Sequence, residues 1–149
     1  MPKLVNSWAT SVLLKLTRLE VAEKRSQRFL KLAAEARSRI AEISVEQTVA
    51  AIKRGALVLD VRERDEFWRG HIPNAKHLAR GTLELEIEKR APDPATEIVV
   101  YCGAGNRAAL SADNLQRMGY RNVRSLAGGL QAWINAGLPV SRGGYPIED

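Results

Sequence analysis

The stretch Glu97-Ile98-Val99-Val100-Tyr101-Cys102-Gly103-Ala104-Gly105-Asn106-Arg107 decides the fold. The continuous apolar run at 97–101 is expected of a strand that is buried on both faces, and residues 56–61 form a second such run. Two strands of this kind predict a parallel sheet that is covered by helices. The small residues after Cys102 then make a turn, and Asn106 begins a helix. We therefore expect an α/β domain with Cys102 at a strand-to-helix turn.

Helix caps, periodicity and glycines place the other elements. Ser44 followed by Gln47 has the form of a capping box, and Gly55 suits the left-handed residue after a last helical turn, so a short helix is expected at about 45–54. The remaining helices are expected over 65–69, 83–90, 106–118 and 129–136, and the remaining strands over 76–79 and 122–126.

The first 43 residues differ from the rest. They hold nine Lys or Arg and four Glu, which is +5 of the total net charge of +6. No proline or glycine occurs from about residue 11 to residue 42, and apolar or small residues recur there in steps of three and four, which predicts one stripe of a long basic amphipathic helix. This stripe consists of Val12, Leu16, Leu19, Ala22, Ser26, Phe29, Ala33, Ala36 and Ile40.

The stripe has two comparable interpretations, which are self-association of the chain as a homodimer and packing of the helix onto the domain. A basic segment also suits nucleic acid or an anionic membrane surface. A solvated helical face is the commoner explanation, and no aromatic residues alternate with the charges, so no nucleic-acid partner is expected.

Length and composition suit a single-domain protein. The 149 residues are expected to form a helical extension (1–43), a domain (44–140) and a C-terminal tail (141–149). The single cysteine allows no internal disulfide and no zinc set, which favours a reducing compartment. The N-terminal apolar run is too short to span a bilayer and lacks a signal-peptide cleavage pattern, and early acidic residues disfavour a mitochondrial presequence, so a cytoplasmic protein is expected.

Cys102 occupies the place where ligands bind in parallel α/β sheets, beyond the carboxyl end of a strand. Several backbone N–H groups at the start of the next helix can point at one spot there and hold a thiolate, a persulfide anion or an oxyanion. A thiolate in this setting is reactive without a separate base. Most lone cysteines are instead buried small hydrophobes. The glycine-rich turn and Arg107 favour the nucleophile.

Five motifs in order resemble the rhodanese family over about residues 43–139. They are Leu59-Asp60-Val61-Arg62, Glu66-Phe67, Gly70-His71-Ile72-Pro73-Asn74-Ala75, Cys102-Gly103-Ala104-Gly105-Asn106-Arg107, and Gly128-Gly129-Leu130 with Ala132-Trp133. The resemblance implies a five-stranded parallel sheet flanked by helices, with Cys102 at the base of a shallow pocket. It also implies a sulfurtransferase, in which the Cys102 thiolate takes the outer sulfur of thiosulfate or a persulfide and passes it to cyanide or a thiol.

The resemblance also implies roles for the residues around the cysteine. Cys102 and Arg107 would be catalytic, and Asp60 with Arg62 would support the end of the neighbouring strand or form a purely structural ion pair. Anions would be stabilised by the backbone amides of the active-site loop, which are those of Gly103, Ala104, Gly105, Asn106 and Ala108. Three further residues are expected to be structural, namely Glu66 as a brace, His71 in a backbone hydrogen bond and Trp133 in the core. No metal or cofactor is expected, because no dinucleotide or P-loop motif is complete.

Two other functions remain open. Phosphatases and arsenate reductases of this architecture place five residues between cysteine and arginine, whereas Cys102 and Arg107 are separated by four, which favours sulfur. A docking module or persulfide carrier with little turnover is the third hypothesis. Gly103 and Ala104 bring no charge to the donor, so we expect weak use of thiosulfate and better use of a less charged sulfane donor or a protein persulfide. The acceptor must come from outside, because the chain has no second cysteine.

Overall fold

A computed structural model describes residues 27–144 of the chain. The predicted helical residues 11–26 and the end of the predicted tail, 145–149, lie outside this range. The described residues fall into two units. The first ends at Leu32, and the second begins at Ala33. In the first unit, residues 27–32 are helical, and in the second unit a helix ends at residue 37.

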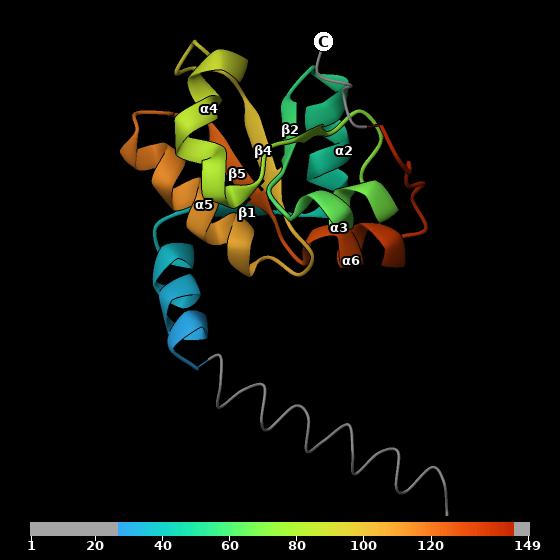
Figure 1. The fold of residues 1–149 in the computed structure, drawn as a ribbon, viewed down its shortest axis with the longest axis horizontal. Coiled ribbons are helices and arrows are strands. Elements are labelled where there is room, and N and C mark those ends of the chain that lie inside the picture. The colour runs from blue at the N-terminus through green and yellow to red at the C-terminus, as the bar shows by residue number, and fades with distance from the viewer. Residues whose placement is uncertain (1–26, 145–149) are drawn as a thin grey trace, which may run out of the picture. The chain divides into compact units, whose positions relative to one another are not determined.

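The second unit contains a five-stranded, all-parallel sheet, as expected (Figure 1). The strand order is β1-β5-β4-β2-β3, so β4, which precedes Cys102, lies in the middle of the sheet. Asp60 at the end of β2 is paired with Tyr101 at the end of β4. The strands are β1 (Ala41–Ile43), β2 (Leu57–Asp60), β3 (Lys76–His77), β4 (Ile98–Tyr101) and β5 (Val123–Leu126).

The helices between residues 45 and 135 are arranged on the two faces of this sheet (Figure 1). In the hydrophobic core, α4 and α5 pack on one face, while α2 and α6 pack on the other. The helices are α2 (Val45–Lys53), α3 (Arg64–Arg69), α4 (Leu83–Arg90), α5 (Asn106–Arg117) and α6 (Gly129–Asn135), with a short 3-10 turn at Arg80–Thr82. The expected helices and strands are thus confirmed to within a few residues at their ends.

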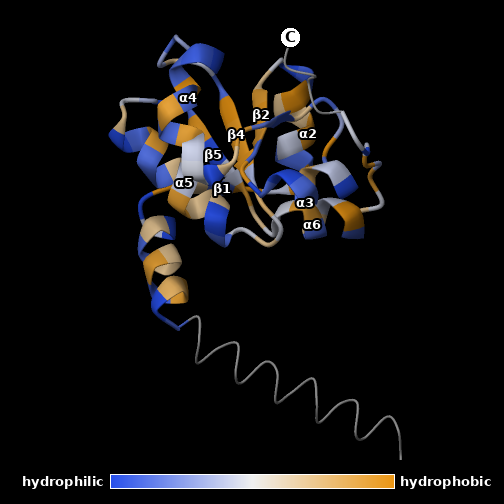
Figure 2. Ribbon diagram, viewed as in Figure 1, coloured by the Kyte–Doolittle hydropathy of each residue, from blue (hydrophilic) through white to orange (hydrophobic). Residues whose placement is uncertain are grey.

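Side chains alternate across the central strands and supply both halves of the core. Leu59 and Val100 lie in the half next to α4 and α5, while Val58 and Val99 lie in the half next to α2 and α6. Figure 2 shows hydrophobic residues along β2 and β4 and hydrophilic residues on much of the surrounding helices. Burying an aliphatic side chain of this size contributes about 1.5–3 kcal/mol. This two-sided burial fixes the position of β4, and with it the position of Cys102.

The predicted helix through residue 42 is wrong at its end. The helix ends at residue 37, and Ala41–Ile43 instead form β1, which pairs with β5 at the edge of the sheet. Only Ile43 of this strand is buried, so it lacks the apolar run that identifies the central strands. Ala33 and Ala36 are fully buried, and Ala36 packs against Ala109 and Leu110 of α5. The end of the helix thus follows the second interpretation, packing onto the domain.

Candidate functional site

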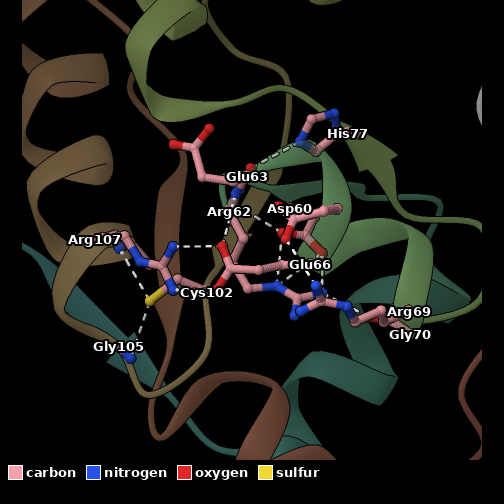
Figure 3. A network of polar contacts seen from close by, with 12 residues as sticks. Asp60, Arg62, Glu63, Glu66, Arg69, Gly70, His77, Cys102, Gly105 and Arg107 are labelled. Atoms are coloured by element: carbon pink, nitrogen blue, oxygen red, sulfur yellow. Dashed lines mark hydrogen bonds and ion pairs between the residues drawn. The ribbon is translucent and has the colours of Figure 1, made fainter.

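The candidate site is the loop that joins β4 to α5. Cys102 is only 1% exposed, and its Sγ accepts hydrogen bonds from the N–H groups of Gly105, at 3.1 Å, and Ala108, at 3.4 Å. Figure 3 shows the sulfur enclosed by this turn. Gly105 has a φ of +119°, which a residue with a side chain rarely adopts, and this conformation turns the chain into α5. The backbone therefore turns around the sulfur atom, as the small residues after Cys102 predict.

The N-terminal end of α6 holds the other side of the loop. Leu130 N–H donates to the Cys102 carbonyl at 2.8 Å, and Gln131 N–H donates to the Gly103 carbonyl at 3.1 Å. Gly129, with a φ of +56°, permits this approach, because a Cβ there would overlap both carbonyl oxygens. A trans peptide places its N–H opposite its C=O. The N–H groups of Gly103 and Ala104 therefore lie on the face of the loop that is turned away from α6.

The loop keeps amide groups available for a ligand. Within residues 27–144, no hydrogen-bond acceptor is found for the N–H groups of Gly103, Ala104, Asn106 or Arg107. The last two lie in the first turn of α5, where backbone N–H groups have no partner within the helix. Together with Gly105 and Ala108, these amides form a set of donors that suits an anion bound at or next to Sγ.

Arg107 is held by Glu66 of α3 rather than lying free in the loop. Its Nη1 is 2.7 Å from Glu66 Oε2 and its Nη2 is 3.1 Å from Glu66 Oε1 (Figure 3). The hydrogen bonds from Arg107 are the main reason why the pKa of Glu66 falls from 4.5 to about 2. The same bonds raise the pKa of Arg107. Glu66 Oε2 also accepts the Glu63 N–H at 2.8 Å, which ties the pair to the start of α3.

Asp60 and Arg62 form a buried ion pair at the end of β2, next to the candidate site. Arg62 Nη2 lies 2.7 Å from Asp60 Oδ2, and their side chains are 8% and 0% exposed. Burial is the largest effect and opposes the charge of Arg62, but the hydrogen bonds to Asp60 and the nearby negative charges together outweigh it, so the pKa of Arg62 is raised. Arg62 Nη2 also donates to the Gly70 carbonyl at 2.6 Å. The pair thereby joins β2 to the loop after α3, which is the bracing geometry of a structural ion pair.

The structure brings the predicted loop residues together and adds partners that the sequence did not assign. The Asn106 side chain accepts a hydrogen bond from Arg37, which was placed in the extension. The sequence predicts Glu66 to be a brace but does not indicate its partner Arg107, and it indicates no specific role for Gly129. Arg37 lies 69 residues before Asn106 in the sequence, and Glu66 lies 41 residues before Arg107. No local sequence signal links the members of either pair.

Two other expectations are confirmed. His71 lies with Nδ1 2.9 Å from the Phe67 carbonyl, in the expected backbone hydrogen bond. Trp133 is 5% exposed in the core, and its Nε1 donates to the Pro139 carbonyl at 2.8 Å. Both side chains stabilise the fold around the loop of Cys102.

Over residues 27–144, no three His, Cys, Asp or Glu side chains gather closely enough to hold a metal ion. Within that same range, no helix has the length and apolar character needed to cross a membrane. A cavity of about 240 Å³ lies by the loop before β4, at the opposite end of that strand from Cys102. It is lined by Glu88, Pro92, Pro94, Met118 and Tyr120.

Comparisons with known proteins relate this architecture to one family. The model of the rhodanese-like domain matches residues 44–136. The chain is 31% identical over 114 residues to thiosulfate sulfurtransferase 18 of Arabidopsis thaliana, covering 68% of this chain and 84% of that protein.

Solved structures agree with this relationship. The polysulfide-sulfur transferase homodimer of Wolinella succinogenes superposes with a TM-score of 0.67 at 27% identity, covering 85% of this chain and 96% of that one. A protein of unknown function from Rhodopseudomonas palustris, described as a possible tyrosine phosphatase, superposes with a TM-score of 0.66 at 32% identity, covering 76% and 93%.

Proposed function

Since this chain belongs to the rhodanese-like domain family, we propose that it transfers sulfane sulfur by way of a persulfide on Cys102. The observation that carries the proposal is the arrangement of amides at the loop. Two N–H groups donate to Sγ, and four more have no acceptor among the described residues. A persulfide adds one anionic sulfur atom to the thiolate, and the four amides supply donors for that atom or for an oxyanion of the donor. Relatives that carry the name sulfurtransferase support this chemistry.

In the first half-reaction, the Cys102 thiolate attacks the outer sulfur of the donor. A new S–S bond forms at Cys102, and the bond that joined this sulfur to the donor breaks. The donor leaves with the electron pair, as sulfite from thiosulfate or as a thiolate from a persulfide. Arg107 contributes by holding the loop. Its guanidinium lies next to Gly103, since a Cβ added to Gly103 would be 3.5 Å from Arg107 Nη2.

In the second half-reaction, an external nucleophile attacks the outer sulfur of the Cys102 persulfide. If the nucleophile is cyanide, it leaves as thiocyanate, and if it is a thiolate, it leaves as a new persulfide. The electron pair of the broken S–S bond returns to Cys102 and regenerates its thiolate. The chain has one cysteine, so no second thiol of the same chain takes part. The thiolate of Cys102 is again held by the amides of Gly105 and Ala108.

The charges near the loop favour a donor with less charge than thiosulfate, which is a dianion. Gly103 and Ala104 carry no charge, and Arg107 is paired with Glu66 at 2.7 Å. We therefore expect a higher kcat/KM for the persulfide of a small neutral thiol than for thiosulfate, with cyanide as the acceptor in both assays. A kcat/KM for thiosulfate equal to or above that for the persulfide would contradict this preference.

Intact-mass measurement tests the persulfide directly. Incubation with a sulfane donor, followed by removal of the donor, should add one sulfur atom, about 32 Da, to the protein. Cyanide should then remove that mass and yield one equivalent of thiocyanate. Cys102→Ser should gain no mass. Wild-type protein that stays unmodified with every donor class, or an equal gain in Cys102→Ser, would reject the proposal.

Phosphate-ester hydrolysis is the second candidate, and the resemblance to the possible tyrosine phosphatase of Rhodopseudomonas palustris favours testing it. Both terminal nitrogens of Arg107 are occupied by Glu66, which leaves the loop arginine less available to a phosphoryl group. The loop is also one residue shorter than the phosphatase loop. We expect no phosphate release from an aryl phosphate above the rate of Cys102→Ser. Release that depends on Cys102 would reverse this ranking.

A further inference from the structure

Arg37, which precedes the matched family domain, reaches the loop of Cys102. Its Nη2 donates to Asn106 Oδ1 at 2.7 Å. Asn106 is the first residue of α5 and directly follows Gly105, whose N–H donates to the Cys102 sulfur at 3.1 Å. One arginine side chain is therefore linked through two consecutive loop residues to the reactive atom.

The Arg37 guanidinium also lies close to Gly105. A Cβ built on Gly105 would be 3.2 Å from Arg37 Nη2 and 3.8 Å from the backbone nitrogen of Gly128. Arg37 Nε is 3.5 Å from Glu42 Oε1, and this ion pair also holds the guanidinium. Gly105 has a φ of +119° and no side chain that could fix its position by packing. Its position therefore depends on contacts with residues outside the loop.

The segment that carries Arg37 is fixed to α5 by contacts that do not involve the loop. Ala36 is fully buried against α5. Arg39 makes two hydrogen bonds to Asp113, at 3.0 and 2.7 Å, and its carbonyl accepts one from Gln116 at 2.9 Å. Asp113 is in the third turn of α5, well beyond the loop. Arg37 and Arg39 thus belong to one anchored segment, but only Arg37 touches the loop.

We propose that Arg37 is a positioning residue for Cys102, which acts through Asn106 and Gly105 to keep the Gly105 N–H directed at the sulfur. The residues before the family domain are then part of the sulfur-transfer site. This assignment deepens the function proposed above and rests on it for its biological meaning. Its physical content is independent of any sulfur donor, because it concerns the stabilisation of the Cys102 thiolate.

The test uses the full chain and alkylation by iodoacetamide, which reads the thiolate of the single cysteine. A hydrogen bond to the thiolate favours the charged form. In Arg37→Gln the Gly105 N–H is less well held, so the pH profile of alkylation should shift to higher pH, and the rate at about pH 7 should fall roughly three- to tenfold. Arg37→Lys keeps one donor and the charge, and it should recover part of this loss.

Arg39→Gln is the matched control, because it removes an arginine from the same segment without touching the loop. It should lower the melting temperature and leave the pH profile of alkylation at the wild-type position. A wild-type profile in Arg37→Gln, or an equal shift in Arg39→Gln, would overturn the proposal. The second result would mean that Arg37 only stabilises the packing of the segment on α5.

A double-mutant cycle tests whether Arg37 acts through Asn106. Asn106→Ala should shift the profile as Arg37→Gln does, and the double variant should shift it no further than the larger single change. Fully additive shifts would overturn the proposed route. Sulfur loading of wild-type protein, measured by mass in parallel, keeps the two proposals distinguishable, because a chain that never accepts sulfur still reports the Arg37 effect through alkylation.

Discussion

Glu66 is the residue through which pH acts on the active-site loop. Its pKa is lowered to about 2, first by hydrogen bonds from Arg107. A carboxylate with a lower pKa in the folded state contributes stability that is complete above the unfolded pKa, near 4.5, and is lost as the pH falls toward about 2. The pair is partly exposed, with side chains 32% and 31% accessible, so solvent screening reduces the contribution to an order of 1–2 kcal/mol.

We therefore predict that Glu66→Gln makes the stability of the protein less dependent on pH. Urea unfolding at about pH 6 and about pH 3 should show a smaller loss of unfolding free energy in the variant than in wild type, with a difference on the order of 1–2 kcal/mol. Asp113 also has a lowered pKa through Arg39, so some dependence should remain. Equal losses in the two proteins would show that the Glu66–Arg107 pair adds no stability.

Gly129 is the second residue whose identity is tightly constrained. In Gly129→Ala, the new methyl group overlaps the carbonyl oxygens of Cys102 and Gly103, so the loop or α6 must move. We predict a loss of about 3 kcal/mol or more in unfolding free energy and slower sulfur loading of Cys102. Chemical denaturation and time-resolved intact mass measure the two effects.

Gly137→Ala is the control for backbone strain alone. Gly137 has a φ of +76°, but a Cβ there would meet nothing within 4 Å. Gly137→Ala should lower the unfolding free energy only by the cost of a left-handed backbone conformation at alanine, about 1–2 kcal/mol. It should leave sulfur loading of Cys102 unchanged. Similar losses in both variants would mean that the contact between α6 and the loop is not the constraint at Gly129.

At the level of elements, the start of α2 shows how a local signal fixes a boundary. Ser44 Oγ accepts the Gln47 N–H at 3.1 Å, and Gln47 Oε1 accepts the Ser44 N–H at 2.8 Å, which completes the predicted capping box. Ser44→Ala should therefore cost about 1 kcal/mol in urea unfolding. Ser38→Ala, at an exposed serine whose hydroxyl donates to the Glu35 carbonyl at 2.6 Å and which caps no helix N-terminus, should change stability by less than about 0.5 kcal/mol. Equal effects would argue against the cap.

The predictability of the elements follows from the range of the forces that form them. The buried strands β2 and β4 and the glycine-ended helices carry their signals in a few consecutive residues. The strand β1 does not, because it has three residues, of which only Ile43 is buried, and its conformation depends on pairing with β5. The no-proline, no-glycine run therefore extended the predicted helix five residues past its observed end at residue 37.

The candidate site likewise has one part that the sequence predicts and another that it does not. Cys102, its amides and Arg107 lie within one heptapeptide and were identified from sequence. Glu66, Gly129 and Arg37 contact that loop from α3, α6 and the N-terminal helix. Their proximity depends on strand order and helix packing, which one sequence does not reveal. The predicted roles of Asp60 and Arg62 remain predictions, although the observed ion pair favours bracing.

For the whole molecule, the contacts of residues 33–43 lead us to propose that the rhodanese-like domain starts near Ala33 rather than at residue 44. A chain beginning at residue 44 lacks β1, the bond from Arg37 to Asn106 and the Arg39–Asp113 pair. We predict that its melting temperature falls by roughly 10 °C or more relative to a chain beginning at residue 27. Differential scanning calorimetry of both chains checks this, and equal melting temperatures would restore the boundary at residue 44.

Association of the chain as a homodimer stays a prediction. Ala33 and Ala36 of the predicted stripe are fully buried within the second unit, so this part of the stripe is not open to a second copy. The relative from Wolinella succinogenes is a homodimer. A seam along this stripe would therefore use its earlier positions, of which Phe29 is exposed and Val12 to Ser26 lie before the described residues.

The bonds from α6 to the carbonyls of Cys102 and Gly103 also set the point during synthesis at which the loop can be completed. The loop gains its α6 partners only after Leu130 and Gln131 have left the ribosome, roughly 30 residues after the cysteine. At the usual rate of translation this interval lasts a few seconds. A nascent chain therefore lacks both bonds during this interval, and the loop of Cys102 can take its final geometry only after α6 has been made.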